Sequence, residues 1–256
     1  MATEPVFSST NLRVDDTDMS AGPSPAGPAA SSSNCARFNA GPDAEHAAEF
    51  YESIYCSANG DPGRVPWADC HACPIVVEWL NAHAPVLVRP GCRAVVVGCG
   101  LGDDLIELAE RGYDVLGFDI SPTAVRWAAR RHPGHAERFI TADLLNPHPR
   151  LVRRFDLVIE AYTLQSIPPA LRTQAARSLE ALMAPRGVLL ATCRARDEQT
   201  SLDDLVSPPY PLTAEELLAA TNAAGLTAMN SDAAVVECPD PRRSGCRHLR
   251  GVFVRA

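Results

Sequence analysis

The feature that most constrains this chain is a regular alternation of strand-like and helix-like segments that begins at residue 93. Short apolar runs rich in β-branched residues alternate with segments whose apolar residues recur at helical spacing. Strands that are buried on both faces and alternate with helices indicate an α/β fold with a doubly wound, mostly parallel sheet. The predicted strands are 94–97, 114–118, 138–141, 157–159 and 188–192, and the predicted helices are 103–110, 122–131 and 169–184.

The C-terminal part departs from this alternation. Thr213 followed by Glu216 is a capping box, which predicts the start of another helix. Strand-like runs follow at 226–230, 233–237 and 249–254, and a turn-rich segment at 239–246 precedes the last of them. We expect this region to form an antiparallel hairpin that closes one edge of the sheet.

The N-terminal region has a different composition. Residues 20–33 contain only Ser, Ala, Gly and Pro, which bury too little apolar surface to offset the entropy of ordering. We therefore expect 1–42 to be a disordered or loosely attached tail, with a lid over a substrate site as the alternative. One domain is expected over 43–256: helical elements at 43–92, the first capped by Asp43, and the sheet core at 93–256.

Charge and cysteine content exclude several classes of protein. The chain has 31 acidic and 23 basic residues and a net charge of −8, which argues against nucleic-acid binding and against an anionic membrane surface. No apolar run approaches the ~18 residues of a membrane helix. The nine cysteines are an odd number, and no basic segment followed by an apolar one opens the chain, so we expect reduced thiols and a cytoplasmic location.

A glycine-rich turn joins the first predicted strand to its helix. The turn reads Gly98-Cys99-Gly100-Leu101-Gly102, and the helix opens at Asp103. Such a turn lets the backbone approach a ligand closely. The dinucleotide fingerprint G-x-G-x-x-G would need Gly at position 103, and an acid there disfavours a pyrophosphate at the helix N-terminus. The turn therefore favours a cationic ligand without phosphates.

Acidic residues stand at the ends of the next three strands. Asp119 is placed to accept both hydroxyls of a ribose, Asp143 to accept from an adenine amino group, and Glu160 ends the fourth strand. Ligands of open α/β sheets bind beyond the carboxyl ends of the strands. The glycine turn and the three acids thus define one crevice.

At this point the sequence resembles the class I S-adenosylmethionine-dependent methyltransferases, and within them the branch of the thiopurine and the thiol and halide methyltransferases. Four segments carry the resemblance: the loop GCGLGDD at 98–104, VLGFDIS at 115–121, Pro66-Trp67, and Pro208-Pro209-Tyr210 before a late helix. It implies a seven-stranded methyltransferase fold that binds S-adenosyl-L-methionine. Position 97 is Val where the wider class often has an acid, so the cofactor's amino group needs another partner.

The resemblance also implies roles for residues of these segments. Trp67 would pack near the methionine moiety, the glycine loop would line its amino-acid end, Asp119 would hold the ribose, Asp143 and Leu144 would flank the adenine, and Glu160 would lie near the sulfonium. The implied cofactor site is Trp67, Gly98, Cys99, Gly100, Gly102, Asp104, Asp119, Ile120, Ser121, Asp143, Leu144 and Glu160.

The predicted reaction is methyl transfer by in-line displacement to a small molecule, most simply a thiol, sulfide or other soft nucleophile. Such an acceptor needs position more than a base, because a thiol with a pKa of ~8.5 is partly ionised near neutrality. No obligatory catalytic base is therefore expected. For the wall of the substrate site we expect Tyr162, Gln165, Arg194 and Tyr210, while the stripe of Phe50, Tyr51 and Tyr55 is interpreted as core packing.

Three alternatives stay open: an O- or N-methyltransferase of a small metabolite, a non-catalytic S-adenosylmethionine-binding module, and a nicotinamide-dependent oxidoreductase, which Asp103 disfavours. A zinc site built from Cys70, Cys73, Cys238, Cys246 and His248 is also disfavoured, because two C-x-x-C pairs at regular spacing are absent. We expect no metal, and the oligomeric state is left open.

Overall fold

The structure is a computed structural model that describes residues 46–197, 200–201, 207–229, 235–239 and 247–255. The predicted tail at 1–42 lies outside them, as do Asp43 and most of the predicted turn at 239–246. The helices are α1 (Ala47–Ala58), α2 (Pro74–Ala82), α3 (Ala84–Leu87), α4 (Asp103–Glu110), α5 (Pro122–Arg131), α6 (Arg172–Leu182) and α7 (Ala214–Ala223). The strands are β1 (Arg93–Val97), β2 (Asp114–Asp119), β3 (Phe139–Thr141), β4 (Phe155–Ala161), β5 (Met183–Arg194), β6 (Leu226–Ala228), β7 (Val235–Pro239) and β8 (Arg247–Arg255).

The strands form one mixed sheet in the order β3-β2-β1-β4-β5-β8-β6. The first five are mutually parallel, and β8 lies antiparallel to β5. β6 pairs with residues 253–255 of β8, and β7 pairs with residues 247–251 of the same strand. These two strands therefore lie end to end along the edge of β8 that faces away from β5. The sheet therefore has seven strand positions, which confirms the predicted doubly wound fold and its antiparallel C-terminal hairpin.

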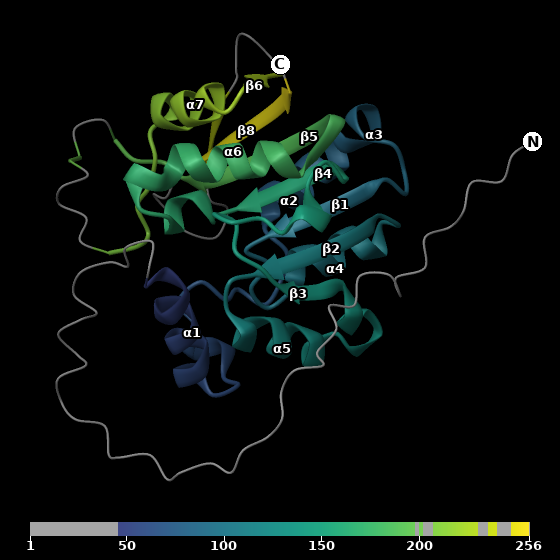
Figure 1. The fold of residues 1–256 in the computed structure, drawn as a ribbon, viewed down its shortest axis with the longest axis vertical. Helices are drawn as coiled ribbons and strands as arrows, with labels where there is room; N and C mark the ends of the chain where they lie inside the picture. Colours follow the sequence, from purple (N-terminus) through teal and green to yellow (C-terminus); the bar gives the residue numbers. More distant parts are fainter. Residues whose placement is uncertain (1–45, 198–199, 202–206, 230–234, 240–246, 256) are drawn as a thin grey trace, which may run out of the picture.

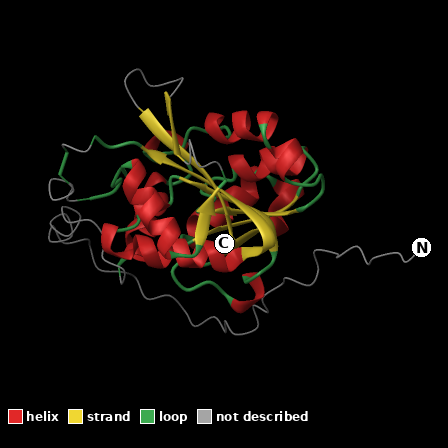
Figure 2. Ribbon diagram, turned by 90° about the horizontal axis from the view of Figure 1, so that it is seen from above, coloured by secondary structure: helices red, strands yellow, loops and turns green. Residues whose placement is uncertain are grey.

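Helices cover both faces of the sheet, as Figures 1 and 2 show. On one face the apolar sides of α6 and α7 pack on Val95, Val97 and Val158; on the other, α2 and α4 pack on Ala94 and Val96. Consecutive residues of β1 thus enter opposite cores, as the pleat requires. This explains why the parallel strands are apolar without alternation.

Most predicted elements are found close to their expected limits. The helices at 103–110 and 122–131 have the predicted bounds, and the capping box of Thr213 and Glu216 is formed. Two boundaries were wrong. α1 begins at Ala47 with His46 as its N-cap, rather than at Asp43. The helix expected at 169–184 is a short 3-10 turn at Pro169–Leu171 followed by α6, and residues 183–184 already belong to β5.

Helix α1 of the N-terminal helical segment lies at the carboxyl edge of the parallel strands. α1 packs beside α5 (Figure 1), and Tyr55 of α1 joins a small core with Leu101, Ala124 and Trp127. The hydroxyl of Tyr51 donates to the carbonyl of Ser166, at the end of the 3-10 turn η6 (Leu164–Ser166), at 2.7 Å. Among the described residues, no helix is long and apolar enough to cross a membrane.

Candidate functional site

A cavity of about 520 Å³ opens at the carboxyl ends of the parallel strands, between the sheet and α1. Its size is in the range of small-molecule sites. Cofactor-sized ligands of open α/β sheets bind at this edge. Of the predicted site residues, those that line it are Trp67, Gly98, Cys99, Gly100, Asp104, Asp119, Ile120, Asp143, Leu144, Tyr162, Gln165 and Arg194.

The glycine loop forms the floor of the cavity and needs two of its glycines for steric reasons. Gly98 has φ +62°, and a Cβ there would collide with the hydroxyl of Thr163. Gly100 has φ +51°, and a Cβ there would come within 3.2 Å of the Tyr55 hydroxyl. Both positions therefore favour glycine, and the bare backbone faces the cavity.

Asp119 is held in place by backbone donors. Its Oδ2 accepts from the N–H of Gly100 and its Oδ1 from the N–H of Ser121, each at 2.9 Å. The residue is buried, and burial raises the pKa of its carboxyl group, which these hydrogen bonds oppose. Each carboxylate oxygen keeps a second acceptor position. Asp119 can therefore accept two further hydrogen bonds, as the two hydroxyls of a ribose require.

Two further acids of the cavity are also anchored. Asp104 Oδ1 accepts from the N–H of Cys73 at 2.6 Å, and burial raises the pKa of Asp104 to about 6. Asp143 Oδ1 accepts from the N–H of Leu145 at 2.8 Å. Asp104 thus links the start of α4 to the start of α2, and Asp143 shapes the turn after β3.

An aromatic wall from α1 and the following loop faces the glycine loop. Trp67 donates from Nε1 to the Tyr55 hydroxyl at 2.8 Å, and its ring makes edge contacts with Tyr51 and Tyr55. Phe50, Tyr51 and Tyr55 all line the cavity, so the interpretation of this stripe as core packing alone was wrong. Burial raises the pKa of Tyr51 and of Tyr55, and both phenols are neutral near pH 7.

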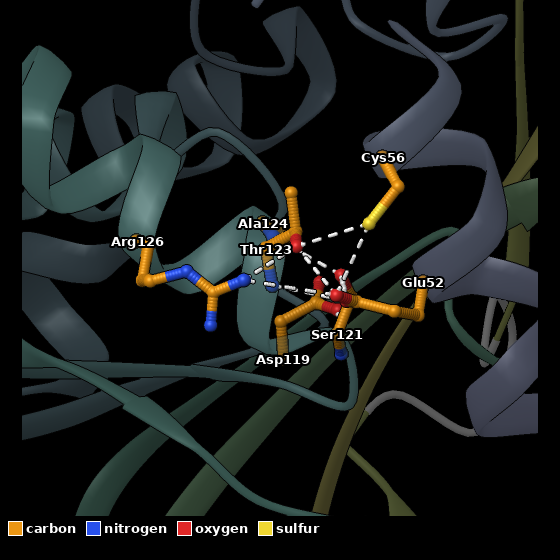
Figure 3. A network of polar contacts seen from close by, with 7 residues as sticks. All are labelled: Glu52, Cys56, Asp119, Ser121, Thr123, Ala124 and Arg126. Atoms are coloured by element: carbon orange, nitrogen blue, oxygen red, sulfur yellow. Dashed lines mark hydrogen bonds and ion pairs between the residues drawn. The ribbon is translucent and has the colours of Figure 1, made fainter. Parts of the chain in front are cut away.

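A polar cluster holds this wall to the sheet (Figure 3). The carboxylate of Glu52 on α1 accepts from Ser121 Oγ and Thr123 Oγ1, both at 2.5 Å, and from the N–H of Thr123 at 3.0 Å. Burial acts to raise the pKa of Glu52, but these hydrogen bonds outweigh it and lower the pKa to about 2. Because Ser121 is the N-cap of α5 and its N–H binds Asp119, the cluster couples α1 to the ribose-side acid.

Another part of the cavity is built from β4, β5 and β8. Tyr162 follows β4, and its hydroxyl lies 3.0 Å from Nδ1 of His248 on β8 and 3.6 Å from Sγ of Cys73. Gln165 is buried, and its Oε1 accepts from the N–H of Arg194 at 2.6 Å. Polar groups of different chemistry therefore converge on this part of the cavity.

Four predicted site residues do not line the cavity. Gly102 lies at the start of α4, where a Cβ would collide with the ring of Phe139. Ser121 caps α5, and Tyr210 is buried with its carbonyl bound to Arg172. Glu160 is fully buried, and its Oε1 accepts from the N–H groups of Thr163 and Leu164.

The position of Glu160 follows from the pleat. Glu160 shares a face of β4 with Val158, which packs in the α6 and α7 core, so its carboxylate lies under the turn and not in the cavity. Burial raises its pKa to about 7. Glu160 therefore does not line the cavity, although the resemblance implied a place for it near the sulfonium.

Sequence reasoning weighed His248 only as a ligand of a disfavoured zinc site and missed it as a cavity residue, whereas the resemblance placed residues 70–73 in the cofactor-side loop, and Cys73 lines the cavity. Cys73 precedes Pro74, the first residue of α2. Its closeness in sequence to Pro66-Trp67 was the signal that could place it in the cavity. His248 had no local signal, because its position depends on how β8 joins the sheet. Within the described part of the chain, no three His, Cys, Asp or Glu side chains are grouped to hold a metal ion.

The donor set of the cavity fits S-adenosylmethionine. Bare glycine backbone, an anchored acid with two remaining acceptor positions, a second acid at Asp143 and an aromatic wall are what its amino-acid, ribose, adenine and sulfonium groups require. Gly98, Gly100, Asp119, Asp143 and Trp67 line this cavity together and are the residues that would hold the cofactor.

Comparison with known proteins agrees with this geometry. Residues 94–187 match a family described as "Methyltransferase domain". The chain is 26% identical over 160 residues to "Probable thiol methyltransferase 2" of Arabidopsis thaliana, a match that covers 61% of this chain and 66% of that protein. It is 30% identical over 134 residues to "Thiocyanate methyltransferase 1" of Brassica oleracea, covering 51% and 57%. The chain thus spans less than two thirds of the length of these curated relatives.

A solved structure shows the same fold. It is 1,6-didemethyltoxoflavin-N1-methyltransferase of Burkholderia thailandensis with bound 1,6-didemethyltoxoflavin and S-adenosylhomocysteine, at 20% identity and a TM-score of 0.64, covering 90% of this chain and 93% of that one. The matched domain contains the glycine loop and the three strand-end acids. Residues 94–187 of this chain thus form a methyltransferase domain, and its sheet order and cofactor-edge motifs resemble those of the class I S-adenosylmethionine-dependent methyltransferases.

Proposed function

We propose that this protein transfers a methyl group from S-adenosylmethionine to a small soft nucleophile, most simply a thiol or sulfide. The observation that carries the proposal is one cavity that is lined both by the glycine loop with the anchored Asp119 and by a second group, Tyr162, Cys73 and His248. The first group fits the cofactor, and the second, which we call the acceptor end, can contact a small acceptor. The thiol and thiocyanate methyltransferases among the relatives support the class of acceptor.

The chemistry suits the walls of this cavity. When bound, S-adenosylmethionine supplies a methyl group on a cationic sulfur, to which an acceptor's electron pair can bond. An anionic acceptor and a sulfonium lose charge together in such a transfer, so a site with little water favours it. Phe50, Tyr51, Ile54 and Ile167 give the cavity apolar walls that exclude water. The residues of the site then hold the two reactants in line, a contribution of about 7–11 kcal/mol to the barrier in well-oriented systems.

We infer that the catalytic unit is the single domain predicted at 43–256. α1 and the loop before α2 supply one wall of the cavity, and the sheet supplies the floor. The helical segment is therefore part of the site and not a separate module.

The experiment is release of S-adenosylhomocysteine with a panel of acceptors: sulfide, methanethiol, an aromatic thiol, a thiopurine, iodide, a catechol and an amine. We expect turnover with the sulfur acceptors, ranked by how well they fill the Tyr162 end. Turnover with only the catechol or the amine would replace the proposal with an O- or N-methyltransferase. Tight cofactor binding without turnover of any acceptor would leave a binding module.

A further inference from the structure

Three side chains from distant parts of the sequence meet at the acceptor end of the cavity. The Tyr162 hydroxyl lies 3.0 Å from His248 Nδ1, and the two rings make an edge contact with centroids 5.3 Å apart. The thiol of Cys73 donates toward the same hydroxyl at 3.6 Å. All three line the cavity, and His248 is 4% exposed. A phenol oxygen thus faces the cavity with an imidazole behind it and a sulfur atom already placed as its donor.

The backbone of Tyr162 is strained, and its surroundings hold it there. Its φ is +66°, a conformation that is uncommon for a bulky residue and costs about 1–3 kcal/mol. Tyr162 donates its N–H to the carbonyl of Thr192 at 2.8 Å, and its own carbonyl accepts from Ser166 Oγ at 2.9 Å. Glu160 binds the next two N–H groups of the turn. Such strain persists where the fold fixes a functional geometry.

We propose that Tyr162 and His248 form a proton-accepting dyad for a thiol acceptor, with Tyr162 as the residue that contacts the thiol. This inference rests on the proposed function and narrows it to acceptors that carry an ionisable proton. Cys73 shows that a sulfur atom fits against the phenol oxygen. A substrate thiol can donate its proton to the second acceptor position of the same phenol oxygen, beside Cys73.

The proton transfer balances within the residues present. The S–H bond of the acceptor breaks, and its proton passes to the Tyr162 oxygen as the phenol's own proton moves to the unprotonated Nδ1 of His248. The sulfur keeps the electron pair and uses it for the new carbon–sulfur bond. The imidazolium of His248 then returns its proton to solvent. Tyr162 stays neutral before and after the step.

The charged neighbours of the dyad come from every element around it. Across the ladder on β5, Arg194 is the register partner of His248, and it also lines the cavity. On the α2 face, Arg250 of β8 pairs with Glu78, and Asp104 of α4 binds the backbone of Cys73. Other ionisable residues on the neighbouring elements whose side chains the structure describes are Asp156 and Glu160 on β4, Arg186 and Cys193 on β5, Glu215 and Glu216 on α7, and Arg247 and Arg255 on β8.

The test compares an acceptor with a proton to lose and one without. The first is N-acetylcysteine methyl ester, whose thiol has a cysteine-like pKa of about 8.5. The second is thiocyanate, an anion with no proton near neutrality. The rates of Tyr162→Phe, His248→Gln and the unchanged protein are measured as kcat/KM from pH 6 to 10.

The expected size of the effect follows from the ionised fraction of the thiol. About 3% of such a thiol is ionised at pH 7 and about 24% at pH 8. Without the dyad only that fraction reacts, so both variants lose about 30-fold at pH 7, about 4-fold at pH 8, and little above pH 9.5. The ratio of thiol to thiocyanate activity falls by the same factors. The matched controls, at the opposite edge of the sheet, are His83→Gln, at an exposed position, and Tyr113→Phe, at a partly buried one.

Several results would overturn the dyad while leaving the proposed function intact. These are equal losses with both acceptors at every pH, a thiol deficit that does not shrink as the pH rises, and a protein that turns over thiocyanate but not the thiol. A protein that turns over neither of these acceptors nor any sulfur acceptor of the panel above would overturn the proposed function itself.

A second readout needs no cofactor or turnover. In protein labelled with ¹⁵N-histidine, Tyr162→Phe is expected to move the Nδ1 resonance of His248 and the pH at which its ring titrates, and Tyr113→Phe is not. An unchanged titration of His248 would show that the Tyr162–His248 hydrogen bond, on which the dyad depends, does not form.

Discussion

Replacing Asp119 tests the cofactor end of the cavity most directly. The carboxylate already accepts one backbone N–H on each oxygen, from Gly100 and from Ser121, each at 2.9 Å. Each oxygen keeps one further acceptor position, which we expect the two ribose hydroxyls to occupy. Asp119→Ala removes both of these interactions, and Asp119→Asn keeps one oxygen but loses the charge.

The expected loss of affinity follows from these two hydrogen bonds. A hydrogen bond to a charged group contributes about 1.5–3 kcal/mol, so two of them contribute about 3–6 kcal/mol. Since about 1.4 kcal/mol is tenfold in Kd, Asp119→Ala should weaken binding by about 100- to 10,000-fold. Asp119→Asn should lose about half of that free energy. The alanine variant also leaves two buried N–H groups unpaired, at about 1–3 kcal/mol each in stability.

The assay is calorimetric titration with S-adenosylhomocysteine, together with thermal unfolding to confirm that each variant is folded. Asp114→Asn, an exposed acid at the other end of β2, is the matched control. A folded Asp119→Asn that binds within threefold of the unchanged protein would refute the assignment of Asp119 to the ribose.

Three further predictions concern the loop, the buried acid and the polar cluster. Gly98→Ala should lower the unfolding free energy by about 1–3 kcal/mol and the cofactor affinity by at least about tenfold, because the added Cβ meets Thr163. The control is Gly112→Ala, where φ is +86° but the Cβ meets open space. Equal losses in both variants would contradict the steric argument. Burial raises the pKa of Glu160 from 4.5 to about 7, so the unfolded chain releases this proton first and stability falls as the pH rises between those values, by about 3 kcal/mol. Glu160→Gln should flatten that dependence in urea unfolding at pH 5 and pH 8; a slope that survives would point to another group. Glu52→Gln should lower stability by about 1–2 kcal/mol at pH 7 and speed amide exchange in α1 relative to α6, whereas unchanged exchange in α1 would show that the cluster does not hold it.

The fold could be predicted from the sequence because its signals are local and repeated. Strand and helix periods differ, and a strand buried on both faces is apolar throughout, as β1 is. The capping box at Thr213 fixed one helix start to the residue. The start of α1 was missed because His46 makes no side-chain cap hydrogen bond, so the polar residues before it gave a false signal.

The cofactor edge of the sheet could be predicted because the common direction of the parallel strands fixes which residues lie there. The residue that ends a parallel strand always lies at the same edge, so Asp119 and Asp143 reach the cavity regardless of packing details. To predict the direction of a side chain at that edge, one must also know the face of the pleated strand on which the residue lies. Counting alternate residues along β4 places Glu160 with Val158, under the turn, and this count was available from the sequence.

His248 escaped prediction at the acceptor end, although Tyr162, Gln165 and Arg194 were predicted there, because an antiparallel strand inverts the rule. β8 runs opposite to the other central strands, so its amino end, and not its carboxyl end, lies at the functional edge. His248 is the second residue of β8 and pairs with Arg194, the last residue of β5. The same count along β8 sets His248 on the face of Val252 and Val254, the face that α2 covers and at which Cys73 begins that helix. In a sheet of this order, the residues that open the inserted antiparallel strand therefore belong among the candidates for contact with substrate, beside those that end the parallel ones.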